Sequence, residues 1–261
     1  MAADHVLDPR GEVILVVCNP NAPFAQPLDE QPGSSKTPTP PAEIFDKMLY
    51  GGWKEGKEFN EKGAIELQID NWDIDALLVV LNILHSRLDQ VPHRLKFEQL
   101  AKIAVVADYY DCQSVAFFSR IWFNGVQYAN LPAGYSRDQL IVLWVSFYFC
   151  WQQKFRKAAL QCIRCSPGAI SSFGLPIPKR VLDAMNERRC VALDEVISMI
   201  YGIRDGLFEH SISGADFGCR TLALGVLIQY LHKAGIPLTQ PRSPYIEIKY
   251  IELGSAYHNW T

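Results

Sequence analysis

The sequence contains no hydrophobic run long enough to cross a membrane and no block of positive charge. The longest apolar run, residues 140–151, would extend about 18 Å as a helix, whereas the hydrocarbon core of a bilayer is about 30 Å thick. Lys and Arg number 25 against 28 Asp and Glu, which gives a net charge of -3. Because nucleic acids are bound by clustered cations, we expect neither a membrane span nor a nucleic-acid partner.

A secretion signal is also missing from the start of the chain. A signal peptide begins with basic residues and continues as a long apolar stretch, but here Asp4, Asp8 and Glu12 surround a short apolar run. The seven cysteines are odd in number and scattered along the chain, which is typical of reduced thiols. We therefore expect an intracellular protein, in the cytoplasm, the nucleus or both.

The usual sequence signatures of catalysis are absent. There is no phosphate-binding loop, no Gly-x-Ser-x-Gly elbow and no His-Glu-x-x-His zinc motif, and the six histidines lie far apart in the sequence. Asp108 and Asp111 enclose two tyrosines, but carboxylates three residues apart at a helix end more often brace a loop than transfer protons. We predict a protein that is not an enzyme and that requires no cofactor.

One pair of cysteines supports an alternative. Cys162 and Cys165 have the spacing of a redox pair or of half a zinc site. A second pair with ligand spacing is missing, and both thiols fall near the end of an expected helix, where packed cysteines are common. We keep a metal-binding or redox protein as the alternative function.

The composition indicates a folded protein with two domains. Of the 261 residues, 49% are apolar and 20% are charged, as in ordinary globular domains. Seven prolines between residues 20 and 41 repeatedly block regular structure. The predicted division is an N-terminal tail at 1–11, a mixed domain at 12–130 with a disordered proline-rich insert at about 20–41, a helical domain at 131–242 and a C-terminal tail at 243–261.

Apolar spacing predicts an α+β fold that is predominantly helical. Asn71 or Asp73 is expected to cap one helix, and Ser136 with Gln139 forms a capping box at the start of another. Ile203 is placed on the apolar face of a long helix. The expected strands are 12–18 and 64–69, and the expected helices are 42–50, 75–86, 97–109, 114–126, 137–162, 178–210 and 217–233.

Several of these stretches together resemble the BTB/POZ domain, in the form common in fungal proteins with a helical C-terminal half. The opening residues 8–16 are similar to the first strand of that family, and 45–55 resemble a helix and the loop that closes it. Residues 65–70 and 76–86 look like the following strand and helix, and 100–112 like the closing helix pair. Residues 174–178 with Arg188 and Arg189 resemble the fungal subgroup. The resemblance implies a partly truncated BTB/POZ-like domain with a small sheet, followed by an all-α domain.

The resemblance implies a non-catalytic adaptor that binds protein partners. Some members of the family engage a cullin ubiquitin ligase through a hydrophobic-x-Glu triplet after this helix, and Trp53-Lys54-Glu55 fits that pattern. Met48 and Leu49, on the same helix, are the other candidate partner-binding residues. A helix that ordinarily takes part in homodimer contacts is replaced here by a proline-rich stretch, which leaves homodimerisation open.

Overall fold

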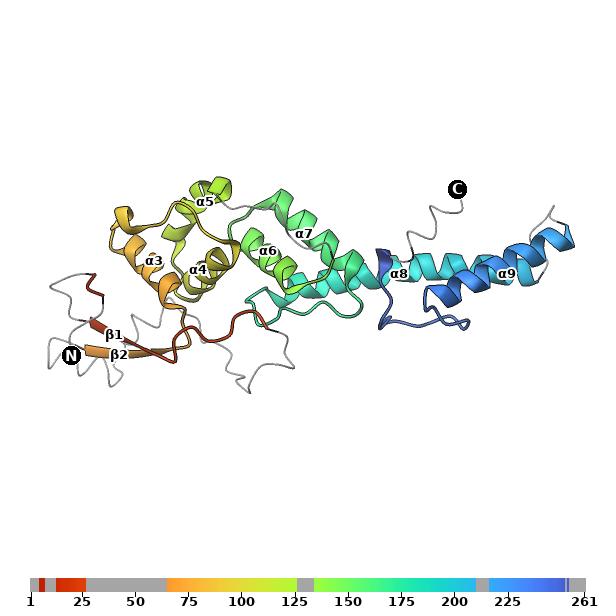
Figure 1. The fold of residues 1–261 in the computed structure, drawn as a ribbon, viewed down its shortest axis with the longest axis horizontal. Helices are drawn as coiled ribbons and strands as arrows, with labels where there is room; N and C mark the ends of the chain where they lie inside the picture. Colours follow the sequence, from red (N-terminus) through yellow and green to blue (C-terminus); the bar gives the residue numbers. More distant parts are fainter. Residues whose placement is uncertain are drawn as a thin grey trace. The chain divides into compact units, whose positions relative to one another are not determined.

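The computed structural model describes residues 5–7, 13–26, 65–125, 134–209, 216–251 and 253 (Figure 1). This part of the chain is α+β and mostly helical, with a small two-stranded sheet, which confirms the predicted fold class at that level. The chain divides into two compact units: residues 1–131, 140–155 and 173–176 form the first, and 132–139, 156–172 and 177–261 the second. The domain bounds given above stay predictions.

The sheet pairs two strands that lie far apart in the sequence. β1 (Val13–Cys18) and β2 (Ile65–Asp70) are parallel, with Val13 opposite Ile65 and Cys18 opposite Asp70. Leu67 and Ile69 of β2 are buried and alternate with exposed residues, as expected for a strand with one covered face. The bounds of both strands were predicted to within one residue. That the two strands pair with each other was not predicted from the sequence.

Two helices pack beside each other after the sheet. α3 (Ile74–Leu84) begins at Asp73, whose Oδ1 accepts a hydrogen bond from the Ala76 backbone N–H at 3.0 Å. Of the two caps that the sequence allowed, Asp73 is therefore the one used. Its Oδ2 lies 2.7 Å from Nζ of Lys102 on α4 (Phe97–Tyr109), so one carboxylate starts α3 and ties it to α4. The short 3₁₀ helix η2 (Leu88–Gln90) lies between them.

The predicted helix at 114–126 is wrong in its first half. A 3₁₀ helix, η3 (Gln113–Phe118), comes first and is followed by α5 (Ser119–Gly125). In a 3₁₀ helix, residues three apart lie on the same side and residues two apart do not. Val115 is buried here, and Phe117, two residues later, is 84% exposed. Trp122 of α5 is fully buried, and its Nε1–H donates to the Pro92 carbonyl oxygen at 2.8 Å. This bond joins α5 to the connection between α3 and α4.

The single helix predicted at 137–162 is also wrong, because the structure contains two helices there. α6 (Arg137–Tyr148) ends and α7 (Gln152–Cys165) begins around Cys150, whose φ is 55°. The Trp151 N–H donates to Ser146 O at 2.8 Å and the Cys150 N–H to Phe147 O at 3.1 Å, a Schellman-type helix end formed without glycine. At the other end of α6, the Ser136 hydroxyl accepts from the Gln139 N–H at 3.3 Å, which confirms the serine half of the predicted capping box. The Gln139 side chain donates instead to the Ala158 carbonyl at 3.5 Å.

The second unit contains a helical hairpin. α8 (Lys179–Phe208) and α9 (Phe217–Lys233) follow the predicted helices closely, and α9 runs back along the C-terminal half of α8 (Figure 1). Their shared core contains Leu193, Ile197 and Tyr201 of α8 with Leu231 of α9. The Tyr201 hydroxyl donates to the Thr239 carbonyl at 3.3 Å, which fixes the segment that follows α9 against α8.

A buried arginine holds that segment further along. Arg189 of α8 is 1% exposed, and its guanidinium donates to four backbone carbonyls, those of Ser166, Pro244, Tyr245 and Ile248, at 2.8–3.2 Å. Burial lowers the pKa of Arg189. The fan of donors on guanidinium suits several acceptors at once, so Arg189 clamps residues 244–248 to α8.

Candidate functional site

The predicted partner-binding residues Met48, Leu49, Trp53, Lys54 and Glu55 lie outside the residues that the structure describes. Their assignment therefore stays a prediction.

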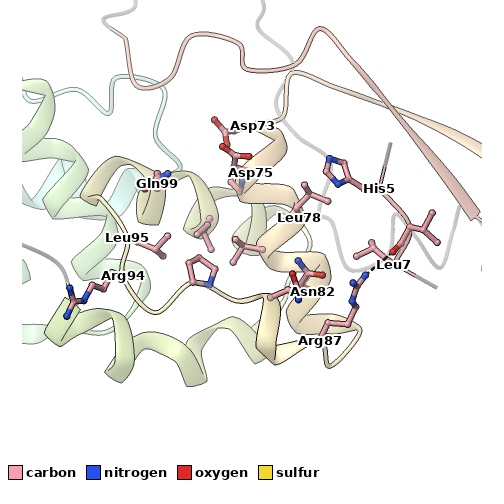
Figure 2. A pocket seen from close by; sticks show the side chains of 16 residues that line it. His5, Leu7, Asp73, Asp75, Leu78, Asn82, Arg87, Arg94, Leu95 and Gln99 are labelled. Atoms are coloured by element: carbon pink, nitrogen blue, oxygen red, sulfur yellow. Dashed lines mark hydrogen bonds between the residues drawn. The ribbon is translucent and has the colours of Figure 1, made fainter. Parts of the chain in front are cut away.

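A groove lies beside α3 in the first unit. It has a volume of about 630 Å³. Leu78 of α3 and Leu95 of the α3–α4 connection line it, together with His5 and Leu7 of the N-terminal segment (Figure 2). The groove therefore combines apolar and polar side chains from three separate segments of the chain. We call it the α3 groove.

Charged groups of both signs lie along the α3 groove. Asp73 and Asp75 stand at the N-terminal end of α3, whereas Arg87 lies just beyond its C-terminal end and Arg94 borders the opposite wall (Figure 2). One of the Arg87 Nη atoms donates to the Val6 carbonyl at 2.8 Å. The groove thus holds a short stretch of the chain's own backbone through a guanidinium.

A second hollow, of about 510 Å³, lies where α4 ends. Asp108, Asp111, Phe117 and Tyr148 line it. Desolvation raises the pKa of Asp108, and the nearby Asp111 carboxylate raises it further. Burial, with Asp108 close by, also raises the pKa of Tyr148. Within the lining that the structure describes there is no histidine, lysine or serine, so the hollow offers carboxyl and phenol groups without a paired nucleophile and base.

Cys162 and Cys165 lie in the last turns of α7 and are both buried. Burial raises the pKa of Cys162 to about 12, and the neighbouring Cys165 contributes. The thiolate is the form that binds metals and attacks disulfides, so this environment works against both roles. Among the residues that the structure describes, no group of three or more His, Cys, Asp or Glu is placed to hold a metal ion.

Thiol labelling tests the alternative that uses this pair. In native protein we expect Cys150 and Cys219, which are exposed, to react with a thiol reagent at least about 100-fold faster than Cys162, because a buried neutral thiol is neither accessible nor nucleophilic. Mass spectrometry of labelled peptides over time would measure this. Fast labelling of Cys162, or zinc retained by the purified chain and lost on Cys162→Ser, would instead favour a metal or redox site.

The pKa of Cys162 also predicts a pH dependence. Its ordinary value is 9.0 and the folded value is about 12, so above pH 9 the unfolded chain loses this proton more readily than the folded chain. The stabilising contribution is therefore complete below pH 9 and is lost as the pH rises toward 12.

Comparison of the chain with protein-family models, with curated proteins and with solved structures found no match. No helix of the described ranges is long and apolar enough to cross a membrane. The α3 groove was not predicted from the sequence, because its walls come from segments that no motif connects. The only sequence signal was the mixture of charged and apolar residues between 87 and 95.

Proposed function

We propose that this protein is a non-catalytic protein-interaction module of the BTB/POZ type that acts as an adaptor. The observation that carries the proposal is the order and pairing of elements in the first unit. β1 pairs with β2 and α3 packs on α4, in the same order as the segments that resemble the family. η3 packs against both helices and carries α5. A fold does not determine a function, so the argument also needs a surface suited to a partner.

The α3 groove supports an interaction role. Peptide-binding grooves combine apolar contacts, which provide affinity, with polar groups that align the bound backbone. Here Leu78 and Leu95 provide the apolar part, and Arg87 shows by its bond to Val6 that a backbone carbonyl is within its reach. The charged rim would give the groove a preference between partners more than additional affinity.

The proposed partner is a cullin scaffold, bound through the triplet Trp53-Lys54-Glu55. We expect the double substitution Trp53→Ala with Glu55→Ala to weaken capture of a purified fungal cullin by about 30-fold or more, because a buried interface tryptophan typically contributes about 2 kcal/mol or more. Titration of the full chain against immobilised cullin would measure the dissociation constant.

Lys54→Ala is the matched control, because it changes the wildcard position within the same triplet. It should leave the dissociation constant within about twofold of wild type. Unchanged binding of the double variant would contradict the cullin site. In the same titration, Arg94→Glu tests the α3 groove separately: a loss of affinity would include the groove in the interface, and full affinity would exclude it.

A further inference from the structure

Part of the α3 groove is lined by a segment that lies far away in the sequence. His5, Val6 and Leu7 line it together with α3 and the α3–α4 connection (Figure 2). These three residues form neither helix nor strand, and His5 and Val6 are exposed. Leu7 is the only one of the three that is half-buried, so the burial of apolar surface holds this segment only weakly.

One polar contact anchors the segment. An Arg87 Nη atom donates to the Val6 carbonyl oxygen at 2.8 Å, and this is the one hydrogen bond between residues 5–7 and the rest of the described chain. A charged donor makes the bond stronger than one between neutral groups, although its exposed position reduces the gain. Its loss should shift the equilibrium between the docked and the released segment about tenfold toward release.

The Arg87 bond can break without disturbing the helices around the groove. Asp73 and Gln99 also line the groove, but their bonds belong to the helix starts. Asp73 caps α3, and the Gln99 Oε1 atom accepts from the Lys96 backbone N–H at 3.1 Å at the start of α4. The side chain of Arg87 instead bonds to residues 5–7. Loss of this bond would therefore free the segment and leave α3 and α4 in place.

A released segment would stay close to the groove. Leu7 lies six residues before Val13, the first residue of β1, and six residues of chain span at most about 20 Å. β1 is itself anchored by its pairing with β2. The short tether keeps the released segment at a high local concentration near Arg87, so the segment can dock again.

We propose that residues 5–7 are a strap, latched by Arg87, that closes over the α3 groove and controls access to it. An extended segment of a partner also presents backbone carbonyls and can replace the Val6 carbonyl at Arg87. The closed strap would then weaken the apparent affinity of the partner in proportion to the fraction of chains that are closed. In this respect the inference rests on the proposed function, because the strap regulates binding only if the groove binds a partner.

Limited proteolysis of the full chain tests the latch. A protease cleaves such a segment in proportion to the fraction of chains in which it is released. Arg87→Met should therefore speed cleavage within residues 5–7 by about five- to tenfold, measured by mass spectrometry of the intact chain. Arg87→Lys keeps one charged donor and should have a smaller effect.

Arg94→Met is the matched control for the latch. Arg94 lines the same groove, but no hydrogen bond joins it to the described residues of the strap. Its substitution should leave the rate of cleavage within about twofold of wild type. Equal cleavage of Arg87→Met and Arg94→Met would overturn the proposal.

Thiol labelling tests whether the strap covers the groove. Leu78→Cys places a thiol in the groove lining. A bulky maleimide should modify it about fivefold faster when His5→Gly and Leu7→Gly are added, because glycine removes the side chains of the strap and raises the entropic cost of docking. Leu88→Cys is the control, since Leu88 is 52% exposed and lies outside the lining. Its rate of labelling should not respond to the strap.

The natural Cys112 serves as an internal reference, because it is buried in the first unit. Its labelling should stay slow in every variant. An unchanged rate for Leu78→Cys after the glycine substitutions would overturn the proposal. Equally accelerated labelling of Cys112 would also overturn it, since residues 5–7 would then be part of the fold and not a strap. None of these measurements uses a cullin, so the strap and the proposed function can fail separately.

Discussion

Replacing Arg189 with methionine is expected to lower the free energy of unfolding of the second unit by about 3–5 kcal/mol. The methionine keeps much of the apolar stem but removes the donors to Ser166, Pro244, Tyr245 and Ile248. These carbonyls would then have no hydrogen-bond donor. Water cannot easily take the place of the guanidinium, because the site is buried. Chemical denaturation followed by circular dichroism would measure the loss.

The neighbouring arginine provides the matched control. Arg188 immediately precedes Arg189 on α8 and is exposed. Arg188→Met should therefore change the free energy of unfolding by less than about 0.5 kcal/mol. Arg189→Lys should fall between the two, because one ammonium cannot reach all four carbonyls. Hydrogen exchange should also become faster at residues 245–248 in Arg189→Met. Equal stability of Arg188→Met and Arg189→Met would contradict the clamp.

Trp122→Ala is expected to destabilise the first unit by about 3–5 kcal/mol. Trp122 is fully buried, and its ring contacts Phe118 and Phe149 with centroid separations of 5.5 and 6.1 Å. Removal of the indole would leave a cavity between η3, α5 and the end of α6, and would also leave the Pro92 carbonyl without its donor. Urea unfolding monitored by near-ultraviolet circular dichroism would report the change.

Two further variants separate the causes. Trp122→Phe keeps most of the ring volume but loses the N–H donor, so its cost should be smaller, about 1–3 kcal/mol, and would measure mainly the unsatisfied Pro92 carbonyl. Phe117→Ala removes an aromatic side chain that is 84% exposed and should have almost no effect. If Phe117→Ala and Trp122→Ala cost the same, the first unit does not depend on this cluster.

Local patterns were sufficient to predict much of the secondary structure. The apolar spacing of α4 and α9 gave both helices with the bounds that the structure shows, because regular burial on one face dictates that spacing. The helix end at Cys150 was missed. Glycine or proline usually marks such a break, but here aromatic packing of Phe149 on Trp151, with centroids 5.3 Å apart, accompanies a positive φ at an ordinary residue.

Tertiary features were less accessible from the sequence. The bond from Arg87 to Val6 joins residues 81 positions apart, and no local pattern relates them. Periodicity likewise identified the apolar face of α8 but not which part of it remains uncovered, since this depends on the path taken by the segment after α9. Of the candidate sites, only the cysteine pair was both predicted and described, and its burial works against the chemistry that its spacing suggested.

The parallel pairing of β1 with β2 has a consequence for the order of folding. Paired residues are 52 positions apart, and bringing the ends of such a length of chain together costs about 3.5 kcal/mol in loop-closure entropy, before any constant term. α3 and α4 are close in sequence and pay much less, so we expect them to pack together before β1 pairs with β2. None of the residues of β1 is fully buried, so we expect it to join last and to detach first. Its departure would expose the backbone groups of β2 that it now pairs, and unpaired strand edges of this kind are where another strand can add.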